Sequence, residues 1–155
     1  FSHSGGILFV MAAIKYGVST VIMPKFSPYN FIKLVEQWNV TGVWMVPPMF
    51  YAILYLKDIA SYKLESLRWA DVFGAPSSPD LLMKFANLFP NAVVINGWGM
   101  TEIVPPISAS TPANIRTVGK VVPNNIELKI FDAYDNEVHT GEIGEIVARG
   151  KSVFS

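Results

Sequence analysis

Short apolar runs alternate with amphipathic segments through the first two thirds of the chain, and this alternation limits the fold more than any other feature. The apolar runs are continuous, as expected for strands that are buried on both faces. We predict such strands at residues 19–23, 43–46, 67–73 and 92–96. Continuous apolar strands separated by helices are typical of α/β proteins, in which a parallel sheet carries helices on both faces.

Two of the intervening segments begin with a complete helix-start pattern. Ser27 precedes Pro28, and Ser78 precedes Pro79, so each serine can cap a helix whose first position is a proline. A third segment, residues 50–56, is apolar enough to be a packed helix. The two capped helices each carry an apolar stripe that we expect to be buried. The stripe residues are Phe31, Leu34, Val35 and Trp38 in the helix after Ser27, and Leu81, Leu82, Phe85, Ala86 and Phe89 in the helix after Ser78.

The pattern changes after residue 102. Residues 103–117 are rich in Pro, Ser, Thr and Asn, and we expect a long loop there. Residues 126–131 alternate between apolar and polar, and residues 143–149 supply a further strand, which predicts antiparallel sheet. We therefore predict an α/β subdomain over residues 1–115 and the start of a β-rich subdomain over residues 116–155.

Charge and composition exclude several classes of partner. Twelve basic and twelve acidic residues give a net charge of zero, and no basic cluster is present, so we expect no binding to nucleic acid. There are no cysteines for disulfides or thiolate chemistry. The longest apolar run has eight residues, residues 7–14, whereas a bilayer-spanning helix needs about 20. We expect no transmembrane segment and a cytoplasmic location, with peripheral membrane association left open.

The chain is also unusually apolar for its size. Hydrophobic residues make up 51% of it, and the mean hydropathy is +0.35. This excess is expected if part of the apolar surface normally packs against more polypeptide, and it predicts a tendency to self-associate.

The segment at residues 96–102 carries the most chemical information. In a parallel sheet, ligands bind beyond the carboxyl ends of the strands, and this segment follows a predicted strand. Trp98 offers a flat face for a purine, and Thr101 and Glu102 offer the oxygen ligands that Mg²⁺ prefers near phosphates. The residues alone leave ordinary roles open, with Trp98 in the core and Glu102 near a helix start.

Five segments together resemble the adenylate-forming superfamily, which contains acyl-CoA synthetases, firefly luciferase and the adenylation domains of peptide synthetases. They occur in the order of that family, and the resemblance covers nearly the whole chain. The segments are FSHSGG at residues 1–6, GAP at 74–76, GWGMTE at 97–102, VGKVVP at 118–123 and GEIGEIVARG at 141–150.

The resemblance implies an AMP-forming acyl-CoA synthetase. Such an enzyme joins ATP and a carboxylic acid, here expected to be a fatty or other medium to long acid, into acyl-AMP, and coenzyme A then displaces AMP. It implies three catalytic residues: Thr101 on a phosphate, Glu102 on Mg²⁺, and His3 beside the acyl group. The implied nucleotide-binding residues are Gly74, Ala75, Pro76, Asn96, Gly97, Trp98, Gly99, Met100 and Thr101. The implied acyl-pocket residues are His3, Phe73, Gly97 and Gly99.

Two positions depart from the family pattern. Phe73 stands where the family loop usually has glycine, so its ring is expected to shorten or reshape the acyl pocket. Trp98 stands where tyrosine is commoner, a variant associated with fatty-acid-activating members. The phosphate loop, a downstream Thr-Gly-Asp and the C-terminal domain with its lysine lie outside the sequence, so we expect residues 1–155 alone to be inactive and to need the remainder of the same enzyme.

Two alternatives remain open at this stage. One is an adenylation domain that activates an amino acid or aryl acid and loads it onto a carrier protein. The other is a non-catalytic nucleotide-binding module of the same fold. Use of free CoA or of a carrier-bound thiol would separate the two kinds of activating enzyme. Flanking sequence that contains the phosphate loop and the terminal lysine would favour either of them over the non-catalytic module.

Overall fold

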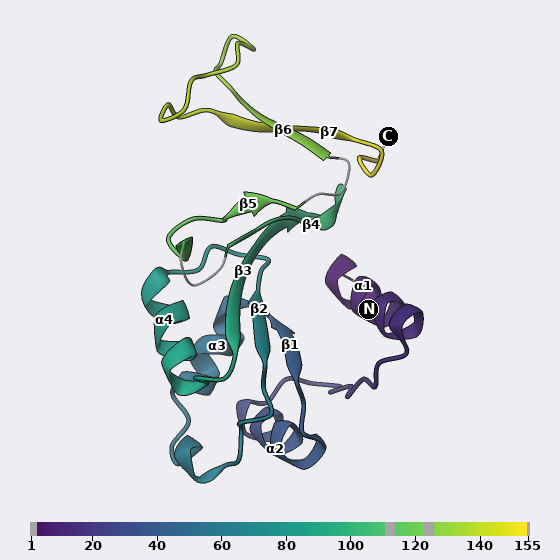
Figure 1. Cartoon of the computed structure of the whole chain (residues 1–155), viewed down its shortest axis with the longest axis vertical. Coiled ribbons are helices and arrows are strands. Elements are labelled where there is room, and N and C mark those ends of the chain that lie inside the picture. Colours follow the sequence, from purple (N-terminus) through teal and green to yellow (C-terminus); the bar gives the residue numbers. More distant parts are fainter. Residues whose placement is uncertain (1–2, 111–113, 123–125, 155) are drawn as a thin grey trace.

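The computed structural model describes residues 3–110, 114–122 and 126–154, and its centre is a five-stranded sheet in the order β1-β2-β3-β4-β5 (Figure 1). The first three strands are parallel, whereas β4 and β5 are antiparallel to their neighbours. The strands are β1 (Gly42–Met45), β2 (Trp69–Val72), β3 (Val93–Met100), β4 (Ile103–Ser110) and β5 (Lys120–Val121). The predicted α/β class is confirmed.

Helices lie on both faces of this sheet. Figure 1 shows α3 and α4 against one face and α1 beside the other. The helices are α1 (Ser4–Tyr16), α2 (Pro28–Trp38), α3 (Pro47–Leu54) and α4 (Pro79–Leu88), with a short 3-10 helix, η1, at Ile59–Ser61. Within the described residues, no helix combines the length and the apolarity needed to cross a membrane.

The main core lies between the sheet and the layer formed by α2, α3 and α4. Phe50 of α3 and Phe85 of α4 are fully buried, and their ring centroids are 4.3 Å apart. On β1 and β2 the alternate residues point into this core, including Val43, Ala70 and Val72. Side chains of the intervening positions therefore face α1, and this second face carries the candidate site.

The two predicted helix starts are confirmed. Ser27 Oγ accepts a hydrogen bond from Asn30 N at 3.4 Å, and Ser78 Oγ accepts one from Leu81 N at 3.2 Å. A proline occupies the first turn of each helix. The helix predicted at residues 50–56 is confirmed as far as Leu54, where α3 ends. It begins earlier than predicted because Pro47 and Pro48 open the helix instead of only ending the preceding strand.

In the Ser78→Ala variant, the free energy of local opening of α4 should fall by about 1 kcal/mol, because the amide of Leu81 loses its hydrogen-bond acceptor. Hydrogen–deuterium exchange of the α4 amides measures this local free energy. Ser27→Ala is the matched control in α2, where the longer hydrogen bond predicts a smaller loss. Unchanged exchange in α4 would contradict the prediction.

The prediction of a strand at residues 19–23 is wrong. This segment has no regular structure, and the side chains of Val21 and Ile22 are exposed. It lines a hollow of about 850 Å³ together with β1, so the two segments are held apart and form no ladder. A β-forming composition is realised only where a neighbouring strand is available for pairing.

The long loop predicted at residues 103–117 is wrong for residues 103–110, because β3 continues to Met100 and these residues return beside it as β4; residues 114–117 belong to no strand. Polar residues are accommodated in β4 by specific bonds: Ser108 is buried, and its Oγ donates to Val118 O at 2.8 Å. The register between β3 and β4 shifts between Trp98 and Met100. Prolines are tolerated at such irregular positions because no ladder hydrogen bond is required of them.

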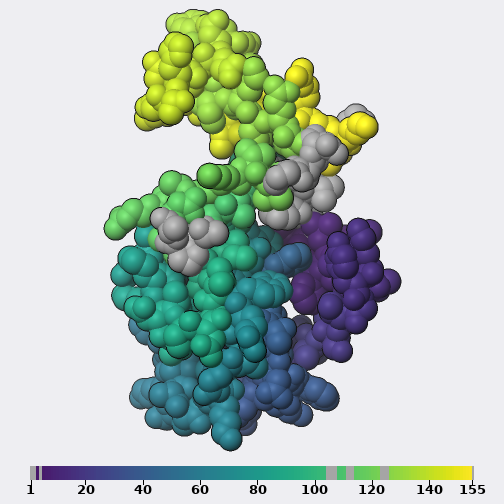
Figure 2. Space-filling view, viewed as in Figure 1, coloured from purple at the N-terminus to yellow at the C-terminus, as the bar shows by residue number. Residues whose placement is uncertain are grey.

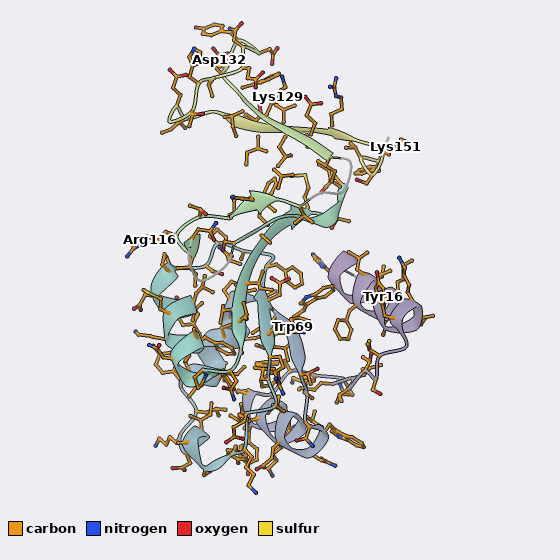
Figure 3. All side chains as sticks on the ribbon, viewed as in Figure 1. Tyr16, Trp69, Arg116, Lys129, Asp132 and Lys151 are labelled. Carbon is orange, nitrogen blue, oxygen red and sulfur yellow. The ribbon has the colours of Figure 1, made fainter. Side chains whose placement is uncertain are left out.

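The predicted antiparallel strands at the end of the chain are confirmed as a hairpin of β6 (Ile126–Phe131) and β7 (Glu145–Gly150). Asp132 organises its turn by accepting hydrogen bonds from the amides of Tyr134 and Asn136, and Figure 3 shows it at the end remote from the large sheet. In Figure 2 the hairpin forms a lobe of its own. The subdomain boundary at residue 115 stays a prediction.

Three parts of the sequence motifs fall outside the described residues. These are Phe1 and Ser2 of the first motif, residues 111–113 of the expected loop, and Pro123 of the VGKVVP segment.

Candidate functional site

A cavity of about 200 Å³ lies at the carboxyl ends of the parallel strands, on the face beside α1; we call it the strand-end cavity. Residues from the start of α1, from β1, from β2 and its following loop, and from the end of β3 contribute to its walls. They are His3, Gly5, Leu8, Trp44, Asp71, Phe73, Gly74, Gly97, Trp98, Gly99, Met100 and Thr101.

Most residues predicted for the site are brought together here. His3, Phe73 and Gly74 meet the segment from Gly97 to Thr101, although they are far apart in sequence. Four of the predicted residues do not line the cavity. Ala75 and Pro76 follow Gly74, Glu102 follows Thr101, and Asn96 turns away. The Asn96 side chain is buried, and its Nδ2 donates to Thr117 O at 3.3 Å. Its role in framing the adenine stays a prediction.

His3 has a structural role at the start of α1. Its Nδ1 accepts a hydrogen bond from Gly5 N at 3.1 Å, which caps the helix. Because Nδ1 is the acceptor, the neutral ring carries its hydrogen on Nε2. The cap fixes the imidazole at the edge of the strand-end cavity, where Nε2 is the atom left to contact a ligand.

The Phe73 ring fills much of the space between α1 and the sheet. Its centroid lies 6.1 Å from the ring of Trp44 and 6.5 Å from the ring of His3. A Cβ added at Gly5 would lie 2.9 Å from the outer carbons of this ring. The bulky residue at position 73 and the absence of a side chain at position 5 are therefore complementary.

Thr101 and Glu102 lie at the turn between β3 and β4. Both are exposed, and the backbone oxygen of Glu102 accepts a hydrogen bond from Phe154 N at 3.0 Å. The described residues contain no group of three or more His, Asp or Glu side chains placed to hold a metal. One carboxylate beside a hydroxyl nevertheless fits Mg²⁺, which usually binds through one or two carboxylates together with substrate phosphates and water.

Asp71 is the site residue that the sequence analysis missed. It sits in the middle of β2, opposite Trp44 of β1 and Ile95 of β3, and it faces α1. Burial raises the pKa of the Asp71 carboxyl from 3.8 to about 6, although a hydrogen bond from the Gly97 backbone opposes the rise. Oδ1 is buried and has no hydrogen-bond partner. A charged residue inside an otherwise apolar strand was the available signal.

The whole chain, residues 1–155, matches the family described as AMP-binding enzyme. It is 33% identical to 4-coumarate–CoA ligase-like 9 of Arabidopsis thaliana, over 96% of this chain and 27% of that protein. The chain thus spans about a quarter of the length of this curated relative.

Solved structures agree with that match. A long-chain-fatty-acid–CoA ligase from Archaeoglobus fulgidus superposes with a TM-score of 0.86 at 28% identity, over 98% of this chain and 33% of that one. The anthranilate CoA ligase AuaEII, in complex with anthranoyl-AMP, superposes with a TM-score of 0.80 at 27% identity, over 88% and 27% of the two chains.

Proposed function

Because this chain belongs to the family of AMP-binding enzymes, we propose that it is a segment of an ATP-dependent acid–thiol ligase that forms acyl-AMP and then acyl-CoA. One observation carries the proposal: the strand-end cavity gathers His3, the Phe73–Gly74 loop and the Gly97–Thr101 segment from separate elements. These are the segments that a nucleotide and an acyl group would have to share.

The nucleotide end of the site is the turn after β3. Trp98 would stack on the adenine beside the Gly74 turn, and the Thr101 hydroxyl would donate to a phosphate oxygen. Glu102 would hold Mg²⁺, which when bound neutralises developing charge on the phosphates. The acid carboxylate then attacks the α-phosphorus, the bond to pyrophosphate breaks, and no proton has to move. Positioning and charge stabilisation are the main demands on these residues.

The second step forms the thioester. The sulfur of CoA attacks the acyl carbon, the bond to AMP breaks, and the thiol proton passes to solvent or a base. His3 lines the cavity, so its Nε2 would contact the acyl-phosphate group and orient it. Gly97 and Gly99 would let the acyl group lie against the backbone of β3.

The nature of the acid separates two candidates. Trp98, the variant associated with fatty-acid-activating members, favours a fatty or other medium to long acid, and the similar structure from Archaeoglobus fulgidus is named a long-chain-fatty-acid–CoA ligase. The cavity volume of about 200 Å³ and the rings of Trp44 and Phe73 in its wall favour a compact acid, such as the one whose anthranoyl group AuaEII holds as anthranoyl-AMP. Pockets for drug-sized ligands usually exceed about 300 Å³.

The remainder of the enzyme is expected to cover apolar surface that is exposed here. Large side chains such as Met11, Ile14, Ile22 and Trp38 are exposed around α1 and the 850 Å³ hollow. Burial of these groups by further polypeptide supports the proposal of a longer ligase, and without it the segment is expected to self-associate.

Acid-dependent release of pyrophosphate tests the proposed function. The longer protein that carries this segment, called the full-length ligase below, should release pyrophosphate from ATP when a carboxylic acid is supplied, and should then consume free CoA. Residues 1–155 alone should release none. Transfer to a carrier-bound thiol in place of CoA would indicate the carrier-loading alternative, and ATP binding without turnover would indicate the non-catalytic module.

Phe73→Gly in the full-length ligase should shift the acid preference toward longer chains, because it removes the ring that lies against Gly5. We expect the ratio of kcat/KM for a long over a short acid to rise by roughly 10-fold or more, since each methylene accommodated in an apolar pocket contributes about that factor. Phe73→Leu, which keeps most of the volume, is the control. An unchanged chain-length profile in Phe73→Gly would rule out this role.

A further inference from the structure

The strand-end cavity is apolar and aromatic on most of its surface, yet one carboxylate lies in its wall. Asp71 belongs to β2, and the residues level with it on the neighbouring strands are Trp44 and Ile95, neither of which carries a charge. Gly5 and Leu8 of α1 close the opposite side of the cavity. An ionised carboxylate in such surroundings is costly unless a partner neutralises it.

Among the described residues that line the cavity, none carries a positive charge to pair with Asp71, and the backbone hydrogen bond from Gly97 only partly offsets the cost of burial. Oδ1 of Asp71 is buried and accepts no hydrogen bond. His3 is the other titratable side chain that lines the cavity, and its Nδ1 is engaged with Gly5 N. The carboxylate therefore has an unused acceptor where a ligand would lie.

Gly97 leaves the place beside this acceptor without a side chain. A Cβ at this position would lie 3.0 Å from Oδ1 and 3.6 Å from Oδ2 of Asp71. Because Gly97 has no side chain, the space beside the carboxylate stays free for a small group from a ligand. A ligand group in contact with the backbone of Gly97 would therefore lie beside the Asp71 carboxyl.

The aromatic walls favour the same kind of group. Trp44 and Phe73 line the cavity next to Asp71, with their ring centroids 6.1 Å apart in an edge-to-face arrangement. Aromatic faces attract cations, most strongly where water is excluded. A protonated amine would satisfy the carboxylate and the rings together, whereas a methyl group would leave the carboxylate unpaired.

We propose that Asp71 selects acids that carry an amino group at the end remote from the reacting carboxylate. The proposal rests on the proposed ligase function and names the substrate class of its acyl site. Thr101 directly follows β3 and lies four residues after Gly97, so roughly 13 Å at most separates the amine site from the phosphate site. A compact amino-substituted acid, with its adenylate at the Thr101 end, suits that length.

A pair of nearly isosteric acids tests the selection in the full-length ligase. We expect kcat/KM for 4-(aminomethyl)benzoic acid to exceed that for 4-ethylbenzoic acid by about 10- to 100-fold, as for a hydrogen bond to a charged group. Asp71→Leu should reverse the order, and Asp71→Asn should abolish most of it. Equal use of the two acids by the unmodified ligase would overturn the proposal.

The pH dependence adds an independent readout. The pKa of about 6 means that Asp71 becomes ionised as the pH rises through that value. The preference for 4-(aminomethyl)benzoic acid over 4-ethylbenzoic acid should therefore grow between pH 5 and about pH 7. His3 also faces the cavity, so the Asp71→Asn variant is needed as a reference. A pH-dependent preference that persists in Asp71→Asn would assign the effect elsewhere and contradict the proposal.

The thermal stability of Asp71 variants distinguishes a residue that binds substrate from one that forms a structural ion pair. The raised pKa of Asp71 means that its ionised form destabilises the fold, and this cost develops as the pH rises from about 4 to 6. Asp71→Asn should therefore raise the thermal midpoint at pH 8. A lowered midpoint would show that Asp71 pairs with a basic group elsewhere in the enzyme, and would overturn the proposal.

Failure of this proposal differs from failure of the proposed ligase function. If 4-ethylbenzoic acid supports pyrophosphate release and the ligase shows no preference for the aminomethyl acid, only the proposed role of Asp71 is refuted. If no acid supports turnover, the ligase function fails, and thermal-shift titration still tests Asp71: the aminomethyl acid should stabilise the unmodified protein and not Asp71→Asn, and equal stabilisation would refute it.

Discussion

The Glu102→Gln variant of the full-length ligase is expected to form acyl-adenylate about 10²- to 10³-fold more slowly. The substitution keeps the size of the side chain and removes the negative charge that would hold Mg²⁺ at the turn between β3 and β4. A loss of this size is typical when one preorganised electrostatic contact to a transition state is removed. Acid-dependent exchange of pyrophosphate into ATP measures the step directly.

The Mg²⁺ dependence distinguishes a metal ligand from a structural residue. If Glu102 holds the ion, the Mg²⁺ concentration that gives half-maximal exchange should rise in Glu102→Gln, while the thermal midpoint stays the same. The structure supports an unchanged midpoint, because the Glu102 side chain is exposed and its recorded bond to Phe154 uses the backbone oxygen.

Glu65→Gln is the matched control for this prediction. Glu65 is exposed and precedes β2, so it lies near the opposite ends of the parallel strands from the candidate site. Its exchange rate and Mg²⁺ dependence should equal those of the unmodified ligase. If Glu102→Gln behaves in the same way as this control, the assignment of Glu102 to Mg²⁺ is wrong, while membership of the family is unaffected.

The elements that could be predicted from the sequence are those whose signals are local. Ser27 and Ser78 satisfy the first amides of their own helices, so the positions of α2 and α4 follow from a few adjacent residues. The segment at residues 19–23 and strand β4 depend instead on which distant segments are available for pairing. Their composition predicted the opposite outcome in both cases.

The same distinction applies to the candidate site. Ligands bind at the carboxyl ends of parallel strands, and Gly74 and Trp98 directly follow the strands predicted at residues 67–73 and 92–96, so their places near the site follow from local signals. Asp71, Trp44 and Leu8 were missed because their place in the cavity depends on the register of β1 and β2 and on where α1 lies. Strand register was not available from a single sequence, since a shift by one residue exchanges the two faces of a strand.

The Gly119→Ala variant should lose about 3–5 kcal/mol of stability, the largest effect on folding that we expect from a single methyl group. Gly119 has a φ of +80°, which an alanine adopts only with strain. An added Cβ would also overlap the carbonyl oxygen of Ala109 and crowd the amide of Ser110, and this backbone cannot rotate away as a side chain can. Both costs fall where β5 joins β4.

Gly17→Ala separates the two costs. Gly17 ends α1 with a φ of +65°, but an added Cβ there has no atom within 4 Å, so only the backbone strain of about 1 kcal/mol remains. Denaturation midpoints of the full-length ligase, with hydrogen exchange of β4 and β5, measure both variants. If Gly119→Ala and Gly17→Ala lose the same stability, the backbone near Ala109 moves away from the added Cβ at no cost. A clearly larger loss in Gly119→Ala, with increased exchange in β4, would show that close approach of two backbones requires glycine in the VGK segment.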